Sequence, residues 1–347
     1  MNSEWKNFLS DNGAELKQTG VNHFGNPKRE RQVASTGDIF CDLSHLSQLE
    51  VSGADSADFL HSLFTNDIHA LKVGDSQLNG WCTPKGRMIA LFYTLRSAED
   101  TFQLLYPAEQ MEGLEKRLQM FILRAKVTLT NRSDTALRIG LSGSDAERQL
   151  APLINPLPHA VDSAVSASSL TVVRIHPALY PRFLLLIDDI EQAKEVWGHL
   201  DVQATAVGHA PWELLNIRAG IPAVFSATQE AFIPQMVNLQ AINGLSFNKG
   251  CYPGQEVVAR MEYLGQLKRT MYHITTPATC SPHAGDTLYA ASSSSAQGAG
   301  KIISIEMNGD GGWEGLAVVE VTAAESNDLT LDQEGTIKLT VQAPKTA

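Results

Sequence analysis

The stretch "NKGCYPGQE", residues 248 to 256, places chemically useful side chains on a bend of the chain. Cys251 is a potential nucleophile, Lys249 lies two residues before it, and glycines stand on both sides. After Gly254, "QEVVARMEYLG" predicts a short helix, so the cysteine would precede a helix N-terminus. The amide N–H groups there, together with Lys249, would favour the thiolate over the thiol. This pattern predicts a reactive cysteine whose sulfur points outward.

A structural role for Cys251 is the second interpretation of the same residues. Unpaired cysteines are among the most buried residue types, and a small apolar side chain suits a tight turn between domains. A Cys-His hydrolase would need a histidine nearby in space, and none of the 10 histidines occurs in a recognisable motif. The residues alone leave the reactive and the structural role open.

The composition is that of a globular protein with more than one domain, because the chain has 347 residues, of which 43% are hydrophobic and 19% charged. Its start lacks the apolar core of a signal peptide, and the run "FLLLI" is too short to cross a bilayer. We therefore expect a cytoplasmic protein without a membrane partner. The net charge of −11 argues against tight, direct nucleic-acid binding. Cysteines at positions 41, 82, 251 and 280 lack CxxC spacing, which predicts neither a disulfide framework nor a metal site.

Strand and helix signals follow one another irregularly, which indicates an α+β fold. Helical periodicity is clearest over 108–125, and "TPKG" predicts the turn of a β-hairpin. After residue 268, five short strand signals separated by turn residues predict a small antiparallel β-barrel. We expect a loosely packed polar arm at 1–37, an α+β region of two subdomains at 38–268, and the barrel at 269–347.

The segment "FIPQMVNLQAINGLSFNKGCYPGQEVVAR" resembles the signature of the YgfZ family of folate-binding proteins. These proteins are related to the aminomethyltransferase, or T-protein, of the glycine cleavage system. The stretches "VSGADSADFLHSLFTNDI", "WCTPKGRMIALF" and "PWELLNIRAGIP" extend the resemblance from about residue 40 to the C-terminus. The core motif, K-G-C-[FY]-x-G-Q-E, is present in full as Lys249, Gly250, Cys251, Tyr252, Gly254, Gln255 and Glu256.

The resemblance implies a T-protein-like multi-domain folate-binding fold with a C-terminal β-barrel. It also implies a cofactor, tetrahydrofolate or a derivative, and a role in iron-sulfur cluster assembly or repair that affects tRNA modification indirectly. The partners would be reduced folate and iron-sulfur enzymes or assembly proteins. Trp212 matches a tryptophan implicated in folate binding, although a core position is an equal alternative. Asn238 and Gln240 could offer amide hydrogen bonds to a pterin, or satisfy a buried loop.

Three positions depart from the pattern of the relatives. T-proteins carry a catalytic aspartate where this chain has Ile89 and Ala90. Many relatives have a glutamate that holds the pterin where this chain has Arg218, and a second tryptophan where it has Leu46. An arginine cannot accept hydrogen bonds from the pterin, so the ligand or its pose would differ. A folate-dependent C1 or aminomethyl transferase and a non-catalytic scaffold are the alternative functions.

Overall fold

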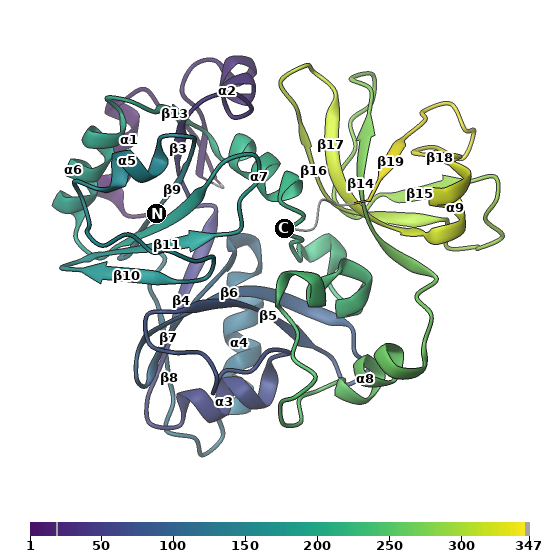
Figure 1. Cartoon of the computed structure of the whole chain (residues 1–347), viewed down its shortest axis with the longest axis horizontal. Coiled ribbons are helices and arrows are strands. Elements are labelled where there is room, and N and C mark those ends of the chain that lie inside the picture. The colour runs from purple at the N-terminus through teal and green to yellow at the C-terminus, as the bar shows by residue number, and fades with distance from the viewer. Residues whose placement is uncertain (19, 344–347) are drawn as a thin grey trace. The chain divides into compact units, whose positions relative to one another are not determined.

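The computed structural model describes residues 1–18 and 20–343, which form two compact units (Figure 1). Each unit is assembled from segments that are separated in the sequence. Unit 1 comprises Met1–Phe59, His69–Gln77 and Phe92–Leu215, and unit 2 comprises Leu60–Ile68, Leu78–Leu91 and Asn216–Ala347. Within the described ranges, no helix combines the length and apolar character needed to span a bilayer.

A six-stranded mixed sheet forms the centre of unit 1, in the order β10-β11-β12-β9-β3-β13. Its strands are β3 (Ile39–Asp42), β9 (Leu137–Ser142), β10 (Ala164–Ala167), β11 (Leu170–Ile175), β12 (Arg182–Ile187) and β13 (Thr205–Val207). Side chains alternate between the two faces of a strand. Phe183 and Leu185 therefore enter the core that also contains residues of α5 (Ala146–Leu150) and α6 (Ile190–Leu200), whereas Leu184 and Leu186 pack with α7 (His209–Arg218).

A five-stranded antiparallel sheet has the order β5-β6-β7-β4-β8, and its strands β5 and β6 contribute residues to both units. Its strands are β4 (Leu46–Ser52), β5 (Ser76–Cys82), β6 (Met88–Ala98), β7 (Thr101–Pro107) and β8 (Thr128–Asn131). Helix α3 (Ser56–Leu63) follows β4, and α4 (Met111–Ile122) buries Leu114, Leu118 and Ile122. The predicted hairpin turn at 83–86 joins β5 to β6, and Gly86 has a φ of 72° there.

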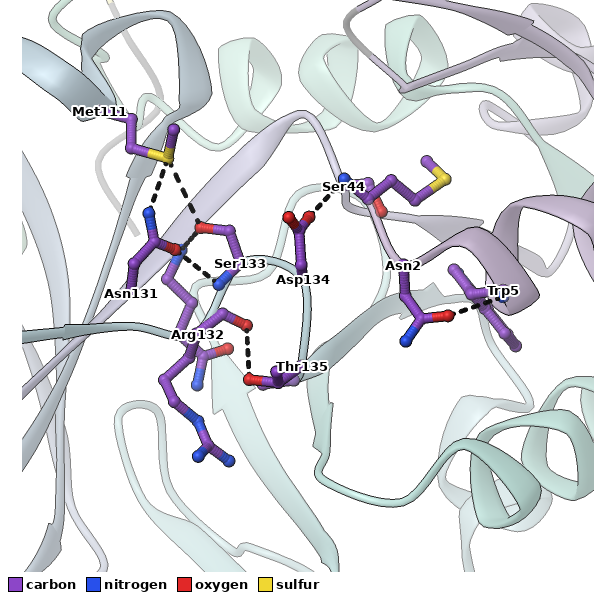
Figure 2. A network of polar contacts seen from close by, with 12 residues as sticks. Asn2, Trp5, Ser44, Met111, Asn131, Arg132, Ser133, Asp134 and Thr135 are labelled. Atoms are coloured by element: carbon purple, nitrogen blue, oxygen red, sulfur yellow. Dashed lines mark hydrogen bonds and ion pairs between the residues drawn. The ribbon is translucent and has the colours of Figure 1, made fainter.

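The N-terminal residues are not a loosely packed arm. They form α1 (Ser3–Asp11), β1 (Glu15–Lys17), β2 (Gly20–His23) and α2 (Pro27–Val33). Trp5 and Leu9 have no exposed surface because they pack in the same core as Trp197 of α6. The indole N–H of Trp5 donates to Asp42 at 2.8 Å. Asn2 caps α1, and its side-chain oxygen accepts from the backbone N–H of Trp5 (Figure 2).

The end of the chain forms the barrel-like antiparallel sheet that the strand signals predicted. Its order is β18-β15-β16-β17-β14-β19, around a core that includes Ile274, Ile302 and Val319. The strands are β14 (Arg269–Thr276), β15 (Thr287–Ala290), β16 (Gly300–Met307), β17 (Trp313–Glu320), β18 (Leu329–Thr330) and β19 (Thr340–Gln342). Helix α9 (Val321–Ser326) lies between β17 and β18 in the sequence. The α+β fold and the C-terminal barrel are therefore confirmed.

Candidate functional site

The sulfur of Cys251 lies at the surface of unit 2, unlike those of two other cysteines. Cys41 and Cys82 are buried, and Cys280 is partly exposed. Burial raises the pKa of the Cys41 thiol well above its ordinary value and that of Cys82 to about 12. Because the thiolate is the reactive form, these two cysteines are poor nucleophiles. Cys251 is therefore the most exposed of the four cysteines.

Cys251 is followed by α8 (Gln255–Leu264), as the sequence predicted. Gly254 is the N-cap with φ of 85°, and Gly265 is the C-cap residue. Pro253 lies before the helix rather than in its first turn. Glu256 is exposed in the first turn, where the helix dipole favours a negative charge. The backbone N–H of Gln255 donates to the Tyr252 carbonyl.

Gly254 is required by the packing of the loop against the β5–β6 hairpin turn. A Cβ atom at this position would lie 2.5 Å from the carbonyl oxygen of Thr83 and 2.6 Å from Cα of Gly86. The residue also adopts the left-handed conformation, which side chains rarely tolerate. At Gly250, in contrast, a Cβ atom would meet His61 at an ordinary distance of 3.4 Å. Of these two motif glycines, Gly254 is the one that close backbone contact demands.

Lys249 binds the loop to the C-terminal end of α3. Its ammonium donates to the carbonyl oxygens of His61 and Phe64 at 2.5 Å and of Asn66 at 3.0 Å. The last carbonyls of a helix lack partners within the helix, and a lysine can satisfy them. Burial lowers the pKa of Lys249 to about 8, and Asp67 acts in the opposite direction. These contacts give the ammonium an anchoring role, and its expected effect on the sulfur of Cys251 stays a prediction.

Tyr252 completes the anchor of the loop. Its side chain is buried, and the Lys249 ammonium lies 5.2 Å from the centre of its ring. Burial raises the pKa of the Tyr252 phenol, so the ring remains neutral under ordinary conditions. Lys249, Tyr252 and Gly254 hold the backbone on both sides of the exposed Cys251.

Asn238 and Gln240 have different surroundings although both precede the cysteine loop. The amide of Asn238 accepts from Thr270 Oγ1 at 2.8 Å and donates to the Met271 carbonyl at 3.3 Å. Asn238 thus ties its turn to β14. The side-chain oxygen of Gln240 is buried and accepts no hydrogen bond from the residues that the structure describes. The side-chain oxygen of Gln240 thus has no donor among the described residues, whereas the amide of Asn238 has protein partners.

Arg218 forms a forked ion pair with Glu314 of β17. The two guanidinium–carboxylate distances are 2.9 and 2.8 Å, and His273 Nε2 lies 3.6 Å from the same carboxylate. Burial acts to raise the pKa of Glu314, but the hydrogen bonds and charges of Arg218 and His273 outweigh it and hold this pKa well below its usual range. Arg218, the position at which the resemblance led us to expect a glutamate, is therefore paired with the carboxylate of Glu314.

Trp212 lies inside unit 1, with 2% of its surface exposed. The guanidinium of Arg182 lies 4.5 Å from the ring centre, and a Cβ atom on Gly140 would come within 2.7 Å of the ring. Burial lowers the pKa of Arg182 to about 10. In this structure the indole is a core side chain, and a ligand would reach only its small exposed part.

Loss of the Glu314 charge is expected to change the acid stability of the protein. A carboxyl whose pKa is lowered by folding stabilises above its unfolded pKa of about 4.3 and loses this contribution as the pH falls toward the folded value. Glu314→Gln should lower the free energy of unfolding by about 2 kcal/mol at pH 7. The difference from the wild type should shrink between pH 5 and pH 3, measured by urea unfolding. The exposed Glu334→Gln is the control, and an equal effect of both variants would contradict the ion-pair role.

Comparison with known proteins shows which family this chain belongs to. Residues 21–176 match the model of the GCVT N-terminal domain. A "tRNA-modifying protein YgfZ" of Edwardsiella ictaluri (strain 93-146) is 32% identical over 290 residues, which cover 82% of this chain and 83% of the relative. The namesake in Yersinia pseudotuberculosis serotype O:1b (strain IP 31758) is 32% identical over 311 residues, or 86% and 88% of the two chains. The chain belongs to the YgfZ family.

The T-protein likeness of this YgfZ-family chain extends over its whole fold. The structure matches glycine cleavage system aminomethyltransferase T from Bartonella henselae with a TM-score of 0.77, covering 100% of this chain and 98% of the other. At 16% identity, this likeness establishes the fold and not the activity. Ile89 and Ala90, the residues that the resemblance sets against the T-protein aspartate, are buried apolar residues of β6.

Three polar residues were not predicted from the sequence: two lie near the cysteine loop, and the third is the partner of Arg218. The Nδ1 atom of His61 lies 3.3 Å from Oδ1 of Asp67, and Glu314 binds Arg218 from 96 positions away. His61 and Asp67 occur in a stretch that carried the resemblance, but their spacing matches no motif. Glu314 lies in a strand with an ordinary sequence pattern, so its contact with Arg218 is evident only in the folded chain. In the part of the chain that the structure describes, no group of three or more His, Cys, Asp or Glu side chains is arranged to hold a metal ion.

Proposed function

We propose that this chain is a folate-binding accessory protein that supports iron-sulfur cluster assembly or repair and so affects tRNA modification indirectly. The observation that carries the proposal is the exposed Cys251 on a loop anchored by Lys249 and Gly254. Curated relatives carry the name "tRNA-modifying protein YgfZ", which supports the link to tRNA. A cytoplasmic location and iron-sulfur enzymes or assembly proteins as partners belong to the same proposal.

The cysteine loop supplies what thiol chemistry requires. Cys251 is accessible, and the N-terminus of α8, which has no side-chain cap, follows it in the chain. Amide dipoles at a helix N-terminus favour a thiolate over a thiol. Lys249 and Tyr252 are buried and restrict the loop, so the sulfur is presented by a fixed backbone. Cys251 is the residue that we assign to thiol or cluster chemistry.

Residues of unit 2 fit a reduced folate through hydrogen-bond acceptors. A pterin ring presents N–H donors, and the buried oxygen of Gln240 lacks a donor among the described residues. Glu314 could also accept, because its carboxylate stays ionised beside Arg218. When bound, tetrahydrofolate would supply a carrier for one-carbon units. Gln240 and the Arg218–Glu314 pair are the groups that we assign to its recognition.

Binding of tetrahydrofolate is the first test of this function. We expect saturable binding in anaerobic calorimetry, with a micromolar dissociation constant that corresponds to about −8 kcal/mol. Gln240→Leu should weaken binding about tenfold, because the loss of one hydrogen bond to a buried group costs about 1.4 kcal/mol. Gln333→Leu, on the exposed barrel surface, should leave it unchanged. A wild type that shows no saturable heat would exclude folate as the ligand.

Complementation tests the role of the cysteine. In a strain that lacks the gene, the wild type and Cys280→Ser should restore the activity of an iron-sulfur enzyme, whereas Cys251→Ser should not. Serine fits an exposed loop position, so the variant should fold normally. Full restoration by Cys251→Ser would favour a scaffold that binds partners without thiol chemistry. Formation of methylenetetrahydrofolate from tetrahydrofolate and an S-aminomethyl thioether donor, with release of the thiol and ammonia, would reveal the transferase alternative, which the apolar Ile89 and Ala90 disfavour.

A further inference from the structure

A histidine and an aspartate lie next to the cysteine loop in unit 2. His61 is in the last turn of α3, and its Nδ1 atom lies 3.3 Å from Oδ1 of Asp67. The Nε2 atom of the same ring lies 3.4 Å from the position that a Cβ atom would take on Gly250. Gly250 is the residue immediately before the exposed Cys251. The imidazole is therefore between a carboxylate and the backbone that carries the thiol.

The backbone around this histidine is fixed by contacts on several sides. Lys249 donates to the carbonyl oxygens of His61, Phe64 and Asn66, which links the loop directly to the turn that carries the ring. The Asn66 amide donates to the Asn243 carbonyl at 2.6 Å, and Thr65 Oγ1 donates to that of Gly244 at 2.8 Å. The approach of His61 to the cysteine loop thus rests on anchored backbone rather than on one flexible side chain.

The order carboxylate, imidazole, thiol is suited to proton transfer. The Asp67 carboxylate, 3.3 Å from Nδ1, electrostatically favours a proton on that nitrogen, and the neutral ring then carries its lone pair on Nε2, the nitrogen that faces Gly250. Consecutive Cα atoms are about 3.8 Å apart, so the exposed Cys251 begins one residue away from this nitrogen. Proton transfer to Nε2 requires a rotamer of Cys251 that brings its sulfur to this nitrogen. An imidazole beside a cysteine is a recurrent means of generating a thiolate at neutral pH.

We propose that His61 accepts the proton of the Cys251 thiol and that Asp67 is the positioning residue that orients the imidazole. This inference rests on the proposed function, in which Cys251 is a reactive thiol. In the reaction the S–H bond breaks, its proton moves to Nε2 of His61, and the sulfur attacks an electrophile. With iodoacetamide as the electrophile, an S–C bond forms, the C–I bond breaks, and iodide leaves. Asp67 and Lys249 are charged groups that contact this turn, and both are unchanged by His61→Gln.

The test is the rate at which iodoacetamide alkylates Cys251 in the full chain, followed by peptide mass spectrometry from pH 5.5 to 10. His61→Gln should slow alkylation about tenfold at pH 7 and move the midpoint of the rate–pH profile up by about one unit. Asp67→Asn should cause a smaller change in the same direction. At pH 10 all three proteins should react alike, because hydroxide then removes the proton. His283→Gln, an exposed histidine in the barrel, is the control that should match the wild type.

The outcomes separate this inference from the function on which it rests. If Cys251 of the wild type reacts no faster than Cys280, the reactive-thiol proposal itself fails. If wild-type Cys251 reacts fast, and Cys251 in both His61→Gln and Asp67→Asn shows the same alkylation rate as the wild type at every pH, only the proton-acceptor role is overturned. A uniform loss of rate that persists at pH 10 in both variants would likewise overturn it, because it would indicate a displaced loop. Asp67→Asn serves as the second variant should His61→Gln fail to fold.

Discussion

Trp212→Ala should lower the free energy of unfolding by about 4 kcal/mol. The indole is 2% exposed and packs in a core that includes Leu184, Leu186 and Leu215. Its removal leaves a cavity and also deprives the fully buried guanidinium of Arg182 of the ring over which it lies. Both losses add, because a buried cation depends on its few partners. Urea unfolding followed by circular dichroism measures the difference.

Trp212→Phe is the matched variant. It retains an aromatic ring below Arg182 and fills most of the space, so we expect a loss of about 1–2 kcal/mol. If Trp212→Ala is nearly as stable as the wild type yet binds tetrahydrofolate much more weakly, the indole is a ligand contact and the core role is wrong. If stability falls as expected, weaker binding by Trp212→Ala is no evidence of direct contact.

Gly254→Ala is expected to destabilise unit 2 by about 3 kcal/mol. Left-handed backbone costs an alanine about 1 kcal/mol, and a Cβ atom 2.5 Å from the Thr83 carbonyl forces backbone to move at a further cost of about 2 kcal/mol. Because the loop and the hairpin turn meet at this glycine, the shift should also loosen the anchor of Cys251. Urea unfolding measures the stability, and limited proteolysis of native protein should show faster cleavage near residue 251.

Gly311→Ala separates the two contributions. Gly311 also has a positive φ, of 90°, but nothing lies within 4 Å of the position of its Cβ atom. This variant should therefore lose only about 1 kcal/mol, the cost of the backbone conformation. Equal effects at both glycines would show that the close approach of Gly254 to Thr83 and Gly86 is unimportant for stability.

Local patterns in the sequence determined a large part of this fold. The three- and four-residue steps between Met111, Leu114 and Leu118 predicted the helix that the structure shows as α4, because this spacing places apolar side chains on one helical face. Turn chemistry at 83–86 predicted the β5–β6 hairpin, and the five strand signals after residue 268 predicted the barrel. The stretch after Gly254 predicted the short helix that the structure shows as α8. These features depend on neighbours within a few residues, so a sequence reveals them.

Interactions between distant segments were decided only by the tertiary structure. The N-terminal region seemed too polar to pack, yet Trp5 and Leu9 enter the core of unit 1 because α6, far along the chain, supplies the apolar surface that covers them. Polarity averaged over residues 1–37 conceals two side chains that lie on one face of α1. A core is formed by whichever faces meet, and local composition does not contain that information.

The partners of the site residues were likewise decided by contacts between distant segments of the chain. The motif identified Cys251, but the ammonium of Lys249 is directed by the carbonyl oxygens at the end of α3, 183 to 188 residues earlier. Arg218 obtains its carboxylate from Glu314 on β17, and His61 reaches Gly250 only because that helix end and the loop are joined. Residue types set what each group can do, whereas the partners that fix protonation and orientation are brought together by folding.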